Sequence, residues 1–389
     1  MRIRSIDLIR GLCILLMLIT HGLHAWLTYS SKWFFILFGV TFGSICANGF
    51  VFVSGMGSGL SWVKSERTSV SNKDRYLRPL SSGIVLLTVS VVYNFFATIL
   101  GPEEGWQTFT WWYLFQCLAV CRLLSLAFLK IKTKWGICAV VCFIALSGIL
   151  LAGIDYGETT DPLKTFLFTL FYAPLHQYPI LVYFPFYLMG MLVGKEIQTY
   201  IENPDASPDL IKRWLSASGM FMIVGLILGL QSWSLDLGWE IIAWLKTYPS
   251  GPITELPFFL FLNTYAWCFF FTGFQILGAM LLLYYFDIRH NKQSPSSTPK
   301  KGLLELFGQY SLTIYIGHMI LYLFTPELDY LVVWGPIVAL ILVVTACIWL
   351  LERFGKGKFS LEYLIGILEK GLYHKFQIKA GLKGTSKDN

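Results

Sequence analysis

Charged residues are scarce in this sequence: Asp, Glu, Lys and Arg together account for only 14% of its 389 residues. Soluble domains typically carry about 25%, so a water-soluble globular class is excluded. Hydrophobic residues make up 55% and aromatic residues 17%, with a mean hydropathy of +0.60. Several apolar stretches reach the length of about 20 residues that a bilayer demands. The sequence therefore predicts an all-α, multi-pass integral membrane protein.

The chain also lacks the motifs of the common nucleotide-driven and hydrolytic enzymes. It has no Walker A sequence, no GxSxG and no HExxH, so ATP-driven pumping and the common hydrolase and protease mechanisms lose support. None of its eight cysteines forms a CxxC motif, and buried Cys commonly behaves as a small hydrophobe. No metal site is predicted, and nothing in the sequence predicts a nucleic-acid partner.

Ten hydrophobic segments are predicted to cross the membrane. We place them at 5–27, 41–63, 79–101, 109–129, 136–153, 179–194, 214–233, 257–286, 303–324 and 330–351. With the N-terminus in the cytoplasm, the cytoplasmic pieces hold 25 of the 30 Lys and Arg residues, and the outer pieces hold only Lys32, Lys164 and Lys246. Positive charge marks the cytoplasmic side, so both termini are predicted to be cytoplasmic. The first segment is expected to be a transmembrane helix and not a cleaved signal peptide, because charges interrupt its apolar core and no small-x-small cleavage site follows.

Several other segments break this regular pattern. Residues 164–178 and 234–256 are predicted to be re-entrant or interfacial segments on the outer side, and 292–300 a flexible cytoplasmic linker. We divide the chain into a transmembrane domain, 1–351, and a basic cytoplasmic tail, 352–389. Apolar residues recur in the tail at helical spacing, which predicts a helix lying on the anionic inner leaflet. A partner-binding helix is the alternative.

Three ionisable residues interrupt the first hydrophobic segment: Asp7, Arg10 and His21. A charge at the bilayer centre costs at least ~2.5 kcal/mol, so such residues are usually paired and often functional. Arg10 and His21 are eleven residues apart, which on a helix places them on one face about 16 Å apart along the axis. Arg10 could hold a phosphate or carboxylate, and His21 could accept a proton. A structural Asp7–Arg10 pair and a hydrogen-bonded core His are the alternative.

Further candidate residues lie on later segments. His24 and Ser54 could contact a substrate, and Gly55 and Gly59 form a small-xxx-small face that lets helices approach closely. Ser311 and His318 share a helix face, and His318 is weighed equally as a substrate-binding residue and as a hydrogen-bonding link between helices.

Three arginines are candidates for binding phosphate on the cytoplasmic side. Arg75 and Arg78 lie at the mouth of the third segment, where they either satisfy the positive-inside rule or bind the phosphates of a cofactor. Arg122 lies more than a turn inside the fourth segment. It either extends to the surface, pairs with Asp7, or adds to a phosphate site beside Arg10.

Six short motifs follow one another along residues 4–320, and each is weak by itself. They are Asp7-x-x-Arg10-Gly11 with Arg10-x10-His21, Phe50-Val-Phe-Val-Ser54-Gly55, Arg75-x-x-Arg78-Pro79, Trp112-Tyr113-Leu114-Phe115-Gln116, Phe184-Pro185-x3-Met189-Gly190-x3-Gly194, and Ser311-Leu-x-Ile-Tyr315-x-x-His318. In this order they resemble the superfamily of acyltransferase-3 and heparan-α-glucosaminide N-acetyltransferase-like membrane acyltransferases. The match looks closest to the branch that contains the heparan enzyme. That enzyme, however, has Asn at the position aligned with His21. A His at this position agrees better with acyltransferase-3 proteins.

The resemblance implies that acetyl-CoA, or another acyl-CoA, binds from the cytoplasm and that the acyl group passes to a hydroxyl or amine of a saccharide or lipid-linked acceptor. His21 would be the catalytic base or a transient acyl carrier, and Arg10 would position CoA or stabilise developing charge. A bacterial inner membrane is the expected location. A secondary transporter that uses Arg10 and His21 as a proton relay, and a catalytically inactive scaffold, are the rival functions. The oligomeric state stays open, a homo-oligomer included.

Overall fold

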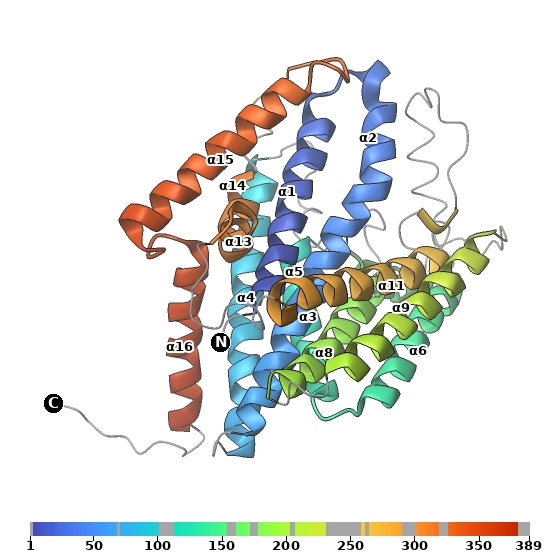
Figure 1. The fold of residues 1–389 in the computed structure, drawn as a ribbon, viewed down its shortest axis with the longest axis vertical. Helices are drawn as coiled ribbons and strands as arrows, with labels where there is room; N and C mark the ends of the chain where they lie inside the picture. Colours follow the sequence, from blue (N-terminus) through green and yellow to red (C-terminus); the bar gives the residue numbers. More distant parts are fainter. Residues whose placement is uncertain are drawn as a thin grey trace. The chain divides into compact units, whose positions relative to one another are not determined.

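The computed structural model describes residues 3–67, 71–100, 113–153, 161–171, 178–202, 207–230, 258–260, 264–289, 301–318 and 326–379. These residues form helices and no named strand (Figure 1). The predicted all-α class is therefore confirmed over the described part of the chain. Contacts divide the chain into two units: unit 1 comprises Met1–Val53 and Ala206–Glu362, and unit 2 comprises Ser54–Asp205 and Tyr363–Asn389.

Six described helices are long and apolar enough to cross a membrane, and a seventh span is added if one bent helix pair is counted. The six run over Arg4–Trp26, Asn72–Phe96, Ile180–Ile201, Asp209–Leu230, Tyr265–Ile288 and Trp334–Gly355. Every predicted segment coincides with helical residues, but the count of ten, the orientation and the division at residue 351 stay predictions. The segment 234–256 and the linker 292–300 lie outside the described residues, and 164–178 lies partly outside them.

Residues 28–40, expected to be an outer loop, are instead largely helical. A 3₁₀ turn at Tyr29–Ser31 leads into α2 (Lys32–Phe38) and the π-helix η2 (Gly39–Gly43). These continue into α3 (Ser44–Glu66), with a bend of 42° between the two halves of this pair. The charge-based topology missed α2 because Lys32 stands near its start and interrupts the apolar run.

Unit 1 is built around α1 (Arg4–Trp26), which runs beside α2 and α13 (Leu303–Gln309) (Figure 1). The contact between α1 and α13 is made by glycine on both sides. A Cβ on Gly11 would lie 1.8 Å from the Leu304 carbonyl oxygen, and one on Gly308 would lie 1.9 Å from the Asp7 carbonyl oxygen. The two backbones therefore touch directly, and this contact sets the position of the helix that carries Arg10 and His21.

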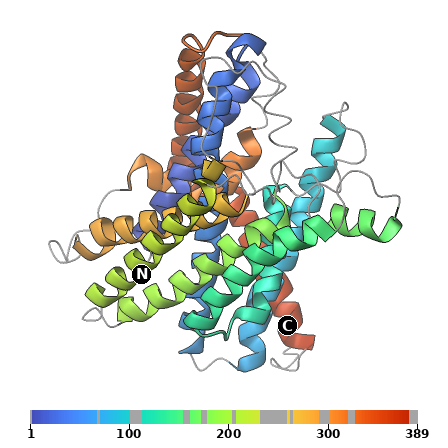
Figure 2. The same ribbon diagram turned by 90° about the vertical axis from the view of Figure 1, so that its right-hand side faces the viewer.

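A second pair of helices in unit 1 packs in the same way. α9 (Ser207–Leu230) lies along α11 (Tyr265–Leu282), as Figures 1 and 2 show. The Ser218 hydroxyl donates to the Gly273 carbonyl at 2.8 Å, which matches the preference of membrane helices for small residues and interhelical hydrogen bonds. α11 continues as the π-helix η8 (Leu283–Arg289), whose Asp287 approaches the start of α1.

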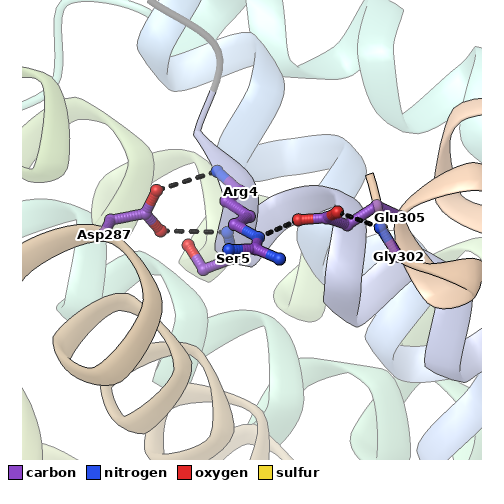
Figure 3. Close-up of polar contacts among 5 residues, drawn as sticks. All are labelled: Arg4, Ser5, Asp287, Gly302 and Glu305. Carbon is purple, nitrogen blue, oxygen red and sulfur yellow. Dashed lines mark hydrogen bonds and ion pairs between the residues drawn. The ribbon is translucent and has the colours of Figure 1, made fainter. Parts of the chain in front are cut away.

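The N-terminus of α1 is capped by a residue distant in sequence (Figure 3). Ile3, at the N-cap, has no side chain that can accept a hydrogen bond. Asp287 takes its place: its Oδ1 accepts from the Arg4 amide at 2.8 Å and its Oδ2 from the Ser5 amide at 2.9 Å. The Arg4 side chain pairs with Glu305, whose other oxygen accepts from the Gly302 amide at 2.6 Å and so caps α13. One cluster thus ties α1, η8 and α13 together.

Replacing Asp287 with Asn is expected to lower the free energy of unfolding by about 1–2 kcal/mol, because an amide offers one acceptor oxygen to two helix amides and no charge to the helix dipole. Unfolding in SDS, followed by circular dichroism, measures this. The exposed Glu327 supplies the control variant Glu327→Gln, which should unfold like the wild type. Equal stability of the Asp287→Asn and control proteins would contradict the capping role.

Unit 2 contains the second half of α3 with α4 (Asn72–Leu100), α5 (Leu114–Leu124), the 3₁₀ turn η5 (Ser125–Phe128), α6 (Thr133–Gly153), α7 (Pro162–Phe171) and α8 (Ile180–Glu202). A Cβ on Gly55 would lie 2.0 Å from the Tyr187 carbonyl oxygen, and one on Gly59 would lie 2.1 Å from that of Met191. The predicted small-residue face at Gly55 and Gly59 is therefore confirmed, with α8 as its partner.

The predicted helix of the C-terminal tail is also confirmed, as α16 (Leu361–Lys379). Within unit 2 it runs antiparallel to the start of α4. Ser82 donates to Glu369, and Gln377 donates to Asp74 at 2.9 Å. Burial raises the pKa of the intervening Tyr373 to about 12, with a further contribution from its hydrogen bond to Asp74. One face of α16 is thus occupied by α4, whereas Leu364, Ile367 and Leu368 remain exposed. Its predicted contact with the inner leaflet stays a prediction.

Candidate functional site

Helix α1 carries three of the predicted site residues: Arg10, His21 and His24. It is one continuous helix from Arg4 to Trp26, so the predicted common face of Arg10 and His21 follows from helical geometry. The side chains of all three residues are partly exposed, whereas Asp7 is buried. These three side chains thus keep some exposed surface, although the helix that holds them packs tightly on α13.

The structure brings His21 together with His318. Their ring centroids are 4.8 Å apart, with the ring planes at 74° in an edge-to-face arrangement. His318 is buried, and its Nδ1 contacts the carbonyl oxygen of Tyr315. Because a carbonyl can only accept, this contact requires a proton on Nδ1 and leaves Nε2 of a neutral His318 as an acceptor. One fixed imidazole therefore lies against one accessible imidazole.

The position of His318 depends on a break in its segment, which contradicts the predicted continuous helix 303–324. The segment forms two seven-residue helices, α13 and α14 (Ser311–Gly317), separated at Tyr310 with φ −107° and ψ 29°. The Tyr310 hydroxyl donates a hydrogen bond to the Glu352 carboxylate. Glu362 caps the new helix start, accepting from the Leu312 amide at 2.6 Å and the Thr313 amide at 3.1 Å. Two distant carboxylates thus stabilise a break that hydropathy could not indicate. Residues 319–325 lie outside the described part.

His24 lies one turn beyond His21 in a different environment. Its ring is 4.9 Å from that of Phe35, and its carbonyl oxygen accepts from Lys32 Nζ. The neighbouring side chains Leu23, Trp26, Leu27, Val333 and Ile337 form an apolar cluster. His24 therefore packs against aromatic and apolar groups, and its predicted contact with a substrate stays a prediction.

The remaining predicted site residues belong to unit 2. Ser54, at the start of the α3 half in this unit, is partly exposed. Arg75 donates from Nη2 to the Glu66 carbonyl at 3.1 Å, and Arg78 is exposed on α4.

α4 and α5 are antiparallel, since Gly83 faces Leu123 and Asn94 donates to Gln116 at 2.7 Å. At a rise of 1.5 Å per residue, Arg122 then lies about 9 Å further along α4 than Arg78.

The sequence did not single out a group of polar residues inside unit 1, at the interface between α3 and α11. Trp267 Nε1 donates to Ser44 Oγ at 2.9 Å, and Gln275 Nε2 donates to the Ile45 carbonyl at 3.1 Å. Asn48 is fully buried, and neither polar atom of its amide has a hydrogen-bond partner. A buried amide left unpaired costs roughly 1–3 kcal/mol per group. An Asn within an apolar helix is the signal that could have drawn attention to this interface.

The ordered motifs agree with a comparison against protein families. Residues 3–353, nearly the whole chain, match the acyltransferase domain Acyl_transf_3. The chain belongs to the acyltransferase-3 family. Among curated proteins none matches the chain. Membership of the acyltransferase-3 family, together with the apolar helices of both units, makes this protein a membrane acyltransferase and an integral, multi-pass membrane protein.

Membership of the acyltransferase-3 family also bears on one rival function considered for the sequence. A secondary transporter that uses Arg10 and His21 as a proton relay loses its support, because the family model covers both residues and describes an acyl-transfer domain. Among the described residues, no group of three His, Cys, Asp or Glu side chains is arranged to hold a metal ion. The His21–His318 pair is the arrangement on which a transfer mechanism can be built.

Proposed function

We propose that this protein transfers an acetyl group, or another short acyl group, from cytoplasmic acyl-CoA to a hydroxyl or amine of a glycan or similar envelope acceptor. The family supports acyl transfer in general, and the donor and acceptor are inferences from the residues. A bacterial inner membrane is the proposed location. The observation that carries the proposal is the contact between an accessible His21 and a buried, oriented His318.

In this mechanism His21 acts as the general base. It accepts the proton of the acceptor hydroxyl or amine while the acceptor O or N attacks the thioester carbonyl carbon. The C–O or C–N bond forms, the C–S bond breaks, and CoA leaves as a thiolate that takes up a proton. Proton transfer by a placed His typically supplies ~10²–10⁴ in rate. Transient attachment of the acyl group to His21 is the alternative route, and the test below separates the two.

His318 fits the role of a positioning residue. Its Nδ1 is committed to the Tyr315 carbonyl, so its ring cannot rotate freely. A fixed ring edge at 4.8 Å restricts the orientations open to His21, and orientation of a catalytic base is a large component of rate. Arg10, on the same face of α1, would stabilise negative charge or help to position CoA.

The phosphates of acyl-CoA are assigned to Arg75 and Arg78. Both lie near the start of α4, and Arg78 is exposed, as a site loaded from the aqueous side requires. Guanidinium groups bind phosphate through paired N–H donors. One Arg75 donor, Nη2, lies against the Glu66 backbone carbonyl at 3.1 Å, which places its guanidinium near the start of α4.

Acetyl-CoA turnover by the purified protein tests the proposal. Release of the free CoA thiol should require both an acceptor-containing envelope extract and intact His21, and acetyl-CoA should raise the thermal unfolding temperature of the solubilised protein. A protein that is neither stabilised by acetyl-CoA nor able to release thiol would refute the assigned donor. Samples quenched in SDS near neutral pH separate the two routes: protein-bound label from [¹⁴C]acetyl-CoA that neutral hydroxylamine releases and that His21→Ala lacks would indicate the acyl-carrier route.

Replacing Arg78 with Gln is expected to raise the KM for acetyl-CoA roughly tenfold or more, with little change in kcat, because a charge-assisted hydrogen bond contributes about 1.5–3 kcal/mol. Initial rates of thiol release over a range of acetyl-CoA concentrations measure this. Lys212 is exposed on α9, so Lys212→Gln serves as the matched loss of a surface cation and should keep the wild-type KM. A change in kcat alone would argue against phosphate binding by Arg78.

A further inference from the structure

Unit 2 contains a buried polar cluster on three helices, apart from the residues of the proposed mechanism. Arg122 and Ser125 come from the α5–η5 segment, Tyr187 from α8 and Ser58 from α3. The Tyr187 hydroxyl hydrogen-bonds Ser58 Oγ at 2.6 Å, and the Ser125 hydroxyl donates to the Arg122 carbonyl at 2.7 Å. Ser58, Ser125 and Tyr187 are all buried. Ser125 also hydrogen-bonds the Tyr187 hydroxyl, so polar side chains from three apolar helices meet there.

Arg122 supplies the charge of this cluster, and its side chain is incompletely satisfied. Its guanidinium lies within electrostatic range of the Tyr187 hydroxyl. Its Nε is buried and has no hydrogen-bond partner, and within unit 2 no described carboxylate forms an ion pair with it. Intramembrane cations are costly and usually have a partner. Arg122 is partly exposed, and a guanidinium whose buried Nε lacks a partner therefore points to an anion that binds there.

The geometry and the charge together select the kind of anion. The Nε–H of a guanidinium and the adjacent Nη–H form two parallel donors, which match two oxygens on one atom. A carboxylate carries one negative charge and balances one guanidinium. A phosphate monoester carries about −1.5 to −2 at pH 7 and would leave excess charge among neutral hydroxyls, which is unfavourable in a low-dielectric interior.

We propose that Arg122, Tyr187 and Ser58 form a binding site for a carboxylate group of a substrate or ligand. Arg122 engages both carboxylate oxygens, and the Tyr187 hydroxyl donates a third hydrogen bond while it accepts from Ser58. This replaces the phosphate-binding role beside Arg10 that the sequence suggested for Arg122, and within unit 2 Arg122 lies about 9 Å further along the α4–α5 pair than Arg78. The site does not depend on the proposed acyltransferase reaction, since its test uses no acyl donor.

Titration of the protein in nanodiscs with carboxyl-¹³C acetate, followed by broadening of the carboxyl NMR signal at constant ionic strength, tests the proposal. Saturable broadening is expected for the wild type and for Lys212→Gln. It should be lost in Arg122→Gln, and the apparent Kd should rise about tenfold in Arg122→Lys, which keeps the charge without the fork. Tyr187→Phe should raise the Kd about threefold or more, since it removes one hydrogen bond.

Three results would overturn the site. They are non-saturable broadening in the wild type, equal broadening in the wild type and the Arg122 variants, or inorganic phosphate that competes with acetate at a lower concentration than acetate itself requires. If Arg122→Gln does not fold, as judged by size-exclusion chromatography, Arg122→Lys and Tyr187→Phe decide the outcome. Lys keeps the positive charge of Arg122, and Phe keeps the ring packing of Tyr187.

Discussion

Replacing His21 with Ala is expected to lower kcat for acyl transfer by ~10²–10⁴, the typical contribution of a placed general base. The residue lies on an accessible face of α1, and its ring contacts His318 at 4.8 Å between centroids. Loss of the imidazole removes the proton acceptor but leaves the Gly11 and Gly308 contact of α1 intact, so the protein should fold. Thiol release from acetyl-CoA under saturating conditions measures the loss.

His24 provides the matched control for this prediction. It lies on the same helix, is also partly exposed, and packs against Phe35 rather than His318. His24→Ala should therefore retain kcat within about a fewfold of the wild type, because no proton transfer is assigned to it, and loss of its predicted substrate contact should show only in the KM for the acceptor. His318→Ala should lower kcat less than His21→Ala, and the double variant should be no worse than His21→Ala alone, since the two act as a unit. A wild-type kcat in His21→Ala would refute the assignment of His21 as the general base.

Replacing Gly308 with Ala is expected to destabilise the protein by more than about 4 kcal/mol and to abolish recovery of folded material. The added Cβ would lie 1.9 Å from the backbone oxygen of Asp7, and backbone cannot move aside as a flexible side chain can. The helices would have to separate, with loss of the packing that holds them together. Yield after size-exclusion chromatography and unfolding in SDS measure the effect.

Gly371 on α16 is the matched control, because nothing lies within 4 Å of a Cβ built there. Gly371→Ala should be neutral or stabilise the protein by up to about 1 kcal/mol, since Ala has the higher helix propensity. Gly11→Ala should behave like Gly308→Ala, because it meets the Leu304 carbonyl in the same interface. Normal yield and stability of both interface variants would show that α1 and α13 are held further apart than described.

Helix positions in this protein could be predicted from the sequence because of the solvent that surrounds them. A bilayer leaves a spanning backbone without water partners, so apolar segments must satisfy their own hydrogen bonds as helices. The first segment, predicted at 5–27, is the helix Arg4–Trp26. α2 was missed because Lys32 stands at its start and interrupts the apolar run, and the break at Tyr310 because the carboxylates that stabilise it, Glu352 and Glu362, are distant in sequence.

The candidate site was only partly predictable. Arg10 and His21 stood out because charge is expensive in a bilayer, and His318 was one of several polar residues in its segment. Their sequence spacing carries no information about which helices meet. The caps supplied by Asp287 and Glu362, distant in sequence from the helix starts that they serve, could not be predicted, since a single carboxylate in a sequence does not reveal its partner.

The sequence by itself determined that this is a helical membrane protein and which ordered motifs place it in the acyltransferase-3 family. It also determined the close-packing face at Gly55 and Gly59, because small residues permit backbone contact whatever the partner is. Only the tertiary structure decided that His318 lies against His21 and that Tyr187 hydrogen-bonds Ser58 within electrostatic range of Arg122. The physical reason is that lipid-facing and helix-facing positions are both apolar, so hydropathy specifies the helices but not their neighbours.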